Sequence, residues 1–167
     1  MKTRKKWWIL GGALAVLAIA GVWAFFAYGP VDRVLSSREA EAYQVYDITL
    51  PEGESSAFSY ILSQCTAEEE QYQADALVIT DYVPKDTLKN VFFRCQEILS
   101  VELMEGKNSK SVDILYKGTE GEEVNLVYGE DGTLLIRVVY FPQRDTMVEY
   151  NAESGKTRMQ RPFRKNG

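Results

Sequence analysis

The chain has no histidine and only two cysteines among its 167 residues. Without histidine there can be no Ser-His-Asp or Cys-His catalytic group and no His-ligated zinc. The side chain that most often serves as a general base near neutral pH is also missing. Both cysteines, Cys65 and Cys95, fall on predicted apolar faces, which argues against a reactive thiolate. The sequence therefore predicts no metal, no cofactor and no enzymatic activity.

Carboxylates are the remaining catalytic groups, because a pair of them can hydrolyse a glycosidic bond. With 24 acidic residues, no pair stands out. Glu130-Asp131-Gly132 lacks the alternating oxygen ligands of a calcium loop and predicts a hairpin turn. Ser154-Gly155-Lys156-Thr157 contains the Gly-Lys-Thr of a phosphate-binding loop, but Tyr150 stands where its first glycine would fall, so no nucleotide is expected. A carboxylate-dependent envelope enzyme of the glycan hydrolase type is kept as an alternative.

The first 31 residues lack acidic side chains, and residues 7–31 lack charge of either sign. About 20 apolar helical residues span a bilayer, so we predict a transmembrane helix over residues 7–28. The aromatic residues expected at the two interfaces are Trp7, Trp8, Trp23, Phe25, Phe26 and Tyr28. The basic residues of segment 1–6, which should keep this end cytoplasmic, are Lys2, Arg4, Lys5 and Lys6.

A cleaved signal peptide is the alternative to this anchor, because Ala18-Ile19-Ala20 is an A-x-A site after a short apolar core. Cleavage there would leave an apolar new N-terminus, Gly21–Tyr28, on a secreted protein. The full length of the run favours an uncleaved, single-pass anchor. We therefore expect everything from residue 32 onward to lie outside the cell membrane.

Charge divides the remaining chain into two parts. Residues 29–155 hold all 24 acidic residues and ten basic ones, a net charge near −14, which would repel nucleic acid. Residues 156–167 hold five basic residues and no acidic ones, and are predicted to be a basic C-terminal tail. The residues expected to contact an anionic surface, such as membrane lipid headgroups, are Arg158, Arg161, Phe163, Arg164 and Lys165. A frayed, solvated end is the alternative.

Residues 29–42 are polar and mixed in charge, and are predicted to be a juxtamembrane linker before a domain over residues 43–155. The β-branched and aromatic residues of segment 43–50 predict a strand. The apolar residues that predict the helix after it share one helical face: Phe58, Ile61, Leu62 and Cys65. Thr66-Ala67-Glu68-Glu69 fits a capping box, which predicts a second short helix.

Residues 76–83 are the most apolar run outside the membrane segment and predict a buried strand that Pro84 ends. Asp86 is expected to cap another helix, and its apolar face repeats the earlier one 30 residues later: Leu88, Val91, Phe92 and Cys95. Two strand–helix units in tandem are therefore predicted. If their helices lie side by side, Cys65 and Cys95 can form a disulfide in an oxidising compartment. The alternative is two thiols that never meet.

From residue 98 the apolar period changes to two, which predicts antiparallel strands joined by short turns. One of them, residues 133–141, should place Leu134, Ile136, Val138 and Tyr140 on one face and Arg137 on the other. A last strand is expected near residues 146–150, with residues 157–160 pairing back onto it. The predicted fold is α+β: an N-terminal transmembrane helix, then a soluble domain with two or three helices packed on a mostly antiparallel β-meander sheet.

We therefore expect a single-pass membrane protein whose extracytoplasmic domain binds another envelope or membrane protein and is not catalytic. The alternatives are the carboxylate-dependent enzyme and the secreted protein described above.

Overall fold

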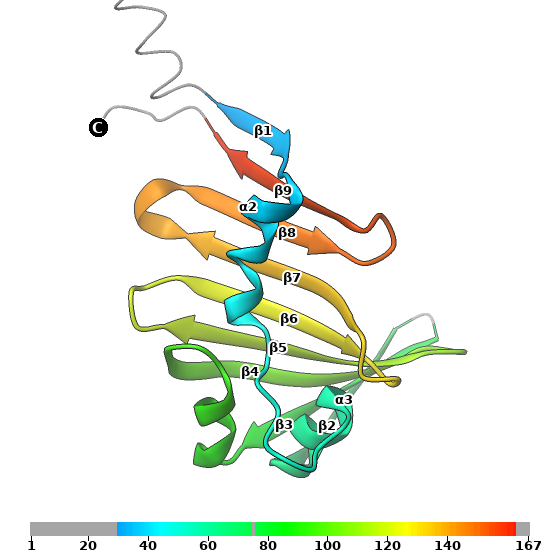
Figure 1. The fold of residues 1–167 in the computed structure, drawn as a ribbon. Coiled ribbons are helices and arrows are strands. Elements are labelled where there is room, and N and C mark those ends of the chain that lie inside the picture. Colours follow the sequence, from blue (N-terminus) through cyan, green and yellow to red (C-terminus); the bar gives the residue numbers. More distant parts are fainter. Residues whose placement is uncertain (1–29, 75, 163–167) are drawn as a thin grey trace, which may run out of the picture.

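The computed structural model describes residues 30–74 and 76–162 of the chain (Figure 1). Within them, the strands form one nine-stranded antiparallel sheet in the order β1-β9-β8-β7-β6-β5-β4-β3-β2. The predicted cytoplasmic end (1–6) and transmembrane helix (7–28) lie outside the described residues and stay predictions. In the described part, no helix is long and apolar enough to cross a membrane.

The sheet is a meander from β2 to β9, and β1 pairs with its last strand. The strands are β1 (Val31–Val34), β2 (Cys65–Ala74), β3 (Leu77–Pro84), β4 (Cys95–Glu105), β5 (Lys110–Gly118), β6 (Glu123–Gly129), β7 (Leu134–Phe141), β8 (Thr146–Asn151) and β9 (Lys156–Arg161). The helices are α2 (Ser37–Glu41) and α3 (Ala57–Ser63), with the 3₁₀ turns η1 (Gln44–Tyr46), η2 (Asp86–Val91) and η3 (Pro142–Arg144). The predicted α+β class with an antiparallel meander is confirmed.

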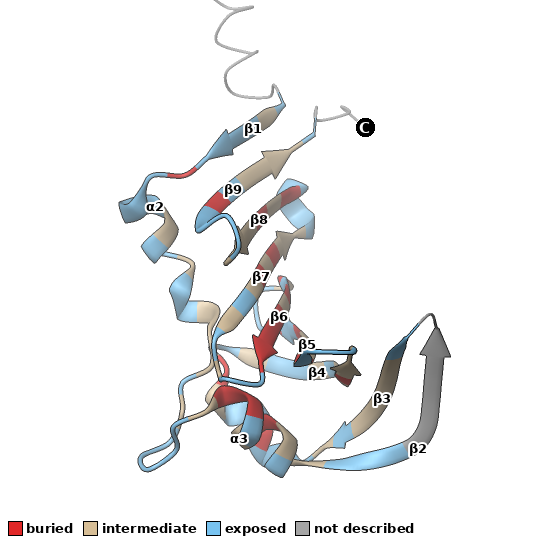
Figure 2. Ribbon diagram, turned by 90° about the vertical axis from the view of Figure 1, so that its right-hand side faces the viewer, coloured by how far each residue is buried: buried red, intermediate tan, exposed pale blue. Residues whose placement is uncertain are grey.

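Alternation along β5 and β6 explains the centre of the sheet, because successive strand residues point to opposite faces. Ile114, Tyr116, Val124 and Leu126 are completely buried on one face, which we call the core face. Residues 35–56, which we call the strap, and α3 lie over this face (Figure 2). No described helix covers the opposite side, the uncovered face.

The β6–β7 turn shows how the sheet and α3 fit together. Gly132 has φ +84°, a conformation that side chains rarely adopt. A Cβ atom there would lie 3.1 Å from Oγ of Ser56, whose side chain caps α3 by accepting the backbone N–H of Ser59. Glycine therefore satisfies both the turn and the close approach of the helix N-terminus.

The segment predicted as a linker, residues 29–42, belongs to the domain. It contains α2 and also β1, which pairs antiparallel with β9 so that Val31 lies opposite Arg161. The backbone N–H of Leu35 extends this pairing by donating to the carbonyl of Thr157 at 2.8 Å. The linker prediction was wrong because the partner strand lies at the far end of the chain, where a local pattern cannot reveal it.

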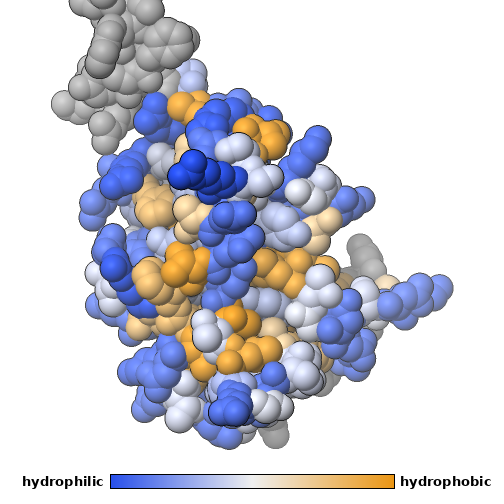
Figure 3. Space-filling model, viewed as in Figure 1, coloured by the Kyte–Doolittle hydropathy of each residue, from blue (hydrophilic) through white to orange (hydrophobic). Residues whose placement is uncertain are grey.

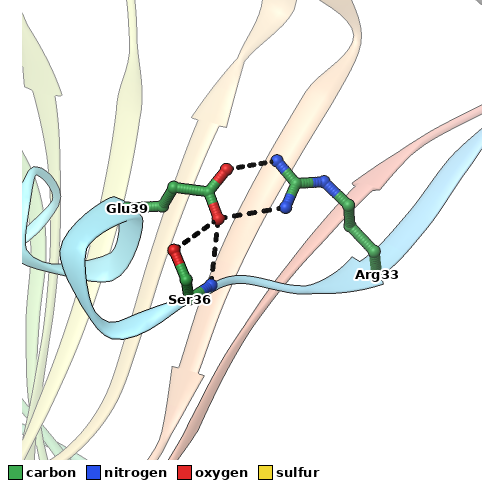
Figure 4. Close-up of polar contacts among 3 residues, drawn as sticks. All are labelled: Arg33, Ser36 and Glu39. Atoms are coloured by element: carbon green, nitrogen blue, oxygen red, sulfur yellow. Dashed lines mark hydrogen bonds and ion pairs between the residues drawn. The ribbon is translucent and has the colours of Figure 1, made fainter.

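A polar cluster fixes the turn between β1 and α2 (Figure 4). One carboxylate oxygen of Glu39 accepts hydrogen bonds from the backbone N–H and the hydroxyl of Ser36, at 3.0 and 2.8 Å. Both of its oxygens accept from the guanidinium of Arg33, at 3.1 and 2.7 Å. These bonds join a helix capping box to the edge strand. They also lower the pKa of Glu39 to about 2, chiefly through Arg33.

The strand predicted over residues 43–50 is absent, and the strap crosses the core face instead (Figure 1). Its polar backbone groups are held by side chains and turns of the layer beneath. The Ile48 N–H donates to the hydroxyl of Tyr128 at 2.9 Å, and the Tyr46 carbonyl accepts from the hydroxyl of Tyr116 at 3.1 Å. Most of the apolar residues that suggested a strand pack against the core beneath, whereas Val45 is 43% exposed. Apolar side chains also remain visible on both sides of the strap (Figure 3).

Of the three predicted helices, only the first is confirmed, as α3. Residues 66–74 are part of the edge strand β2, because β3 offers them an antiparallel partner. The helix predicted from Asp86 stops after the short turn η2, and β4 begins at Cys95. Leu88 and Phe92 are indeed buried, but a 3₁₀ turn followed by a strand satisfies the same spacing. The tandem strand–helix pair is therefore wrong.

Candidate functional site

The predicted basic tail is divided by the fold. Arg158 and Arg161 belong to β9, so the domain continues to Arg161 and does not end at residue 155. Arg158 forms an ion pair with Asp32 of β1, with Nε 2.5 Å from Oδ1 and Nη2 2.7 Å from Oδ2. This hydrogen bonding lowers the pKa of Asp32. Arg158 thus already joins β9 to the edge strand β1, although both side chains of the ion pair remain half exposed.

The other residues predicted to touch a membrane lie outside the described residues. They are Lys2, Arg4, Lys5, Lys6, Trp7, Trp8, Trp23, Phe25, Phe26, Tyr28, Phe163, Arg164 and Lys165. Because β1 and β9 are neighbours, the chain enters and leaves the domain at the same edge of the sheet.

Two carboxylates meet at a hollow of about 530 Å³ beside η3. Glu122 is 2% exposed and accepts the backbone N–H of Glu120 at 3.0 Å. Glu120 itself forms an ion pair with Arg94. Gly118 leaves room for the Glu122 carboxylate, since a Cβ atom there would collide with it. Both carboxylates are engaged in holding the β5–β6 turn, and the glycan hydrolase alternative gains no specific support.

A second hollow, of about 420 Å³, lies between the strap and strands β7 to β9. We call it the Arg137 hollow. Its polar lining comes from Ser37, Gln44, Asp47, Arg137, Tyr150 and Thr157, and Glu41 stands at it as well. Its volume is in the usual range for small-molecule sites, and it offers both hydrogen-bond donors and acceptors.

A buried ion pair forms one side of the Arg137 hollow. Nη1 of Arg137 lies 2.5 Å from each carboxylate oxygen of Asp47, and the two side chains are 4% and 27% exposed. The guanidinium carbon lies 5.4 Å from the ring centre of Tyr150. Burial raises the pKa of Asp47, while the hydrogen bonds and charge of Arg137 act in the opposite direction. Because Arg137 is almost completely buried, forming this ion pair costs desolvation energy, and the pair therefore merits a functional explanation.

The prediction for β7 separated Arg137 correctly from Ile136 and Val138, but it placed Leu134 on the wrong face. The prediction grouped Leu134 with Ile136, Val138 and Tyr140, away from Arg137. A bulge interrupts the β6–β7 register, so Leu134 pairs with Tyr128 while Ile136 pairs with Val127. Arg137 then lies opposite Leu126 on the core face, and Ile136 and Val138 point to the uncovered face. The available signal was that Asp47 is the only charged residue of segment 43–50 and Arg137 the only one of segment 133–141.

The two cysteines are free thiols, at the first positions of β2 and β4. The pair of parallel helices on which the disulfide prediction rested is absent. Cys65 pairs in register with Pro84 and Cys95 with Gly118. Burial raises the pKa of Cys65 to about 11, and burial also raises the pKa of Cys95. Neither environment favours a thiolate.

Among the described residues, no group of three or more Cys, Asp or Glu side chains is arranged to hold a metal ion. Comparisons of the chain with known protein families, with curated proteins and with solved structures found no match.

Proposed function

We propose that this chain is a single-pass membrane protein whose extracytoplasmic domain binds another envelope or membrane protein without catalysing a reaction. The N-terminus would be cytoplasmic and residues 7–28 would form the anchor. Two features of the sequence predict this topology: the basic segment and the uncharged run that follows it.

The observation that supports the proposal is the position of β1. Val31 begins the edge strand only three residues after Tyr28, the last residue of the predicted anchor. If the anchor is as predicted, the linker between the membrane and the domain would be only two residues long. Because β9 is the neighbour of β1, the basic residues that end the chain would lie near the same membrane surface.

With such an anchor, the same pairing would give the domain a membrane end and a distal end. Nine strands are separated by eight spacings, and at about 4.8 Å each the sheet would extend roughly 38 Å from β1 to β2. The β2–β3 hairpin and α3 would therefore be presented away from the lipid (Figure 1). A partner could then reach them without displacing the anchor.

The first test concerns topology. Protease added to intact spheroplasts should digest residues 32–167 and spare the first 30, and the intact protein should retain its N-terminal segment by mass spectrometry. A mature protein that begins at Gly21 or Phe25 would instead establish a secreted form.

The second test concerns the partner. A photocrosslinking amino acid at Leu77, a 37% exposed residue at the start of β3, should give a discrete protein adduct in intact cells. The same probe at Val34, 54% exposed on β1, is the matched control and should react mainly with lipid. Lipid adducts alone at both positions would argue against a protein partner.

A further inference from the structure

We propose that the Arg137 hollow binds a neutral sugar unit, and that an uncharged glycan is therefore a ligand of this domain. Only the availability of such a glycan outside the membrane rests on the proposed function. The binding itself is a property of the hollow. Saccharide binding can therefore fail while the membrane topology is correct, and the topology can be wrong while the saccharide binds.

The hydrogen bonds of Arg137 leave donors for a ligand. Both contacts to Asp47 use Nη1 alone. Among the described residues, neither Nε nor Nη2 has a hydrogen-bond partner, and the side chain lines the hollow. These two nitrogens form one edge of the guanidinium, the edge that donates two parallel hydrogen bonds to neighbouring oxygen atoms.

The charges around the hollow select against ionic ligands. Arg137 contributes one positive charge, whereas Asp47 and Glu41 contribute two negative ones. An anion would be repelled by the two carboxylates, and a cation would have to approach an arginine with unused donors. A neutral ligand that both accepts from Arg137 and donates to the carboxylates meets neither difficulty.

The remaining lining groups match a polyhydroxylated ligand. Four more lining residues carry a hydroxyl or an amide group: Ser37, Gln44, Tyr150 and Thr157. Each can donate or accept, as can the hydroxyls of a sugar. Adjacent hydroxyls of a sugar ring can accept from the Nε/Nη2 edge while donating to a carboxylate.

A purely structural role explains the ion pair less well. The strap is already held to the sheet by the hydroxyls of Tyr116 and Tyr128, which bond the backbone on either side of Asp47. Apolar residues of similar size often stabilise a buried site as well as an ion pair does. The polar hollow is thus more than the attachment of the strap requires.

The test measures saccharide binding to the full chain in phosphatidylcholine nanodiscs by titration calorimetry. Sugar-headgroup detergents are avoided because they would compete. The probes are cellotetraose, which offers hydroxyls only, and chitotetraose, which adds N-acetyl groups; inorganic phosphate and spermidine are the anionic and cationic controls. We expect saturable binding of at least one tetrasaccharide and none of either ion. The inference would be overturned if neither saccharide bound saturably, or if phosphate or spermidine bound.

Variants then locate the binding. Ala40→Trp fills the hollow from α2 and should weaken saccharide binding at least tenfold, whereas Arg38→Trp, on the same helix but outside the hollow, should leave it unchanged. Equal affinity of these two variants would refute the location.

The double variant Arg137→Met/Asp47→Leu removes the ion pair together with its charges. It should remain folded by circular dichroism but lose binding; retained binding would refute the role of Arg137.

Discussion

Two ion pairs of this domain have the same chemistry and different surroundings. In both Arg137–Asp47 and Arg158–Asp32, an arginine nitrogen lies 2.5 Å from an aspartate oxygen. The first pair is 4% and 27% exposed at the centre of the core face, and the second is 54% exposed on both sides at the sheet edge. Removing one partner leaves a poorly solvated charge only in the first case. The centre of the fold should therefore be intolerant of change, and the edge responsive to solvent conditions.

The largest expected effect is at the buried pair. Arg137→Ala leaves Asp47 without its partner and should lower the free energy of unfolding by about 3–5 kcal/mol. Chemical denaturation of the full chain in nanodiscs measures this. Arg158→Ala is the matched control at the edge and should change the unfolding midpoint little. Equal losses in the two variants would mean that burial does not separate the pairs.

The next largest effect tests whether apolar packing gives the same contrast. Leu126 is completely buried and pairs in register with Arg137. Leu126→Ala should lower the free energy of unfolding by about 2–5 kcal/mol, through lost burial and the cavity that remains. Val34→Ala, at a 54% exposed edge position, should be nearly neutral in the same denaturation experiment. A similar loss at Val34 would show that the edge is packed more tightly than its exposure indicates.

A smaller effect concerns the attachment of the strap. Tyr128→Phe removes the hydroxyl that accepts the backbone N–H of Ile48 and should destabilise the fold by about 1 kcal/mol. Amide exchange at Ile48 should accelerate more than exchange along β6. Unchanged protection of Ile48 would show that the strap is held by other contacts.

The smallest effect is expected at the edge and depends on pH. Contacts with Arg33 and Ser36 lower the pKa of Glu39 to about 2, below the ordinary value of 4.5. The stabilisation is therefore complete above the ordinary pKa and is lost as the pH falls toward 2. Exchange of the Leu35 amide, corrected for its intrinsic pH dependence, should increase from pH 5 to pH 2 in the native chain. Glu39→Gln should show a weaker pH dependence, and the same dependence in both would exclude Glu39 as its origin.

The parts of the fold that sequence analysis predicted correctly are those with local patterns. Alternation of apolar residues from residue 98 onward predicted the central antiparallel strands, and the spacing of Phe58 and Ile61 predicted α3. The same reasoning failed at Leu88 and Phe92, because burial at helical spacing does not distinguish a helix from a 3₁₀ turn followed by a strand.

The candidate site depended on information that no local pattern contains. Asp47 and Arg137 are 90 residues apart and meet only because the strap crosses the sheet. A bulge in the β6–β7 register also puts Leu134 on the same face of β7 as the arginine. Similarly, β1 is four residues long and its partner lies near the other end of the chain. Long-range pairing and register therefore had to come from the three-dimensional structure.

The pairing of β1 with β9 also dictates an order of assembly. Asp32 and Arg158 are separated by 126 residues, so the edge strand cannot acquire its neighbour until almost the whole domain has been synthesised. Strands β3 to β8 can each pair with the preceding strand as the chain grows, but β1 must wait for β9. Contacts of such long sequence separation form slowly because the intervening loop must first be closed. A chain interrupted before residue 156 would keep its central strands and leave β1, and with it any anchor that precedes it, connected to the domain through the strap alone.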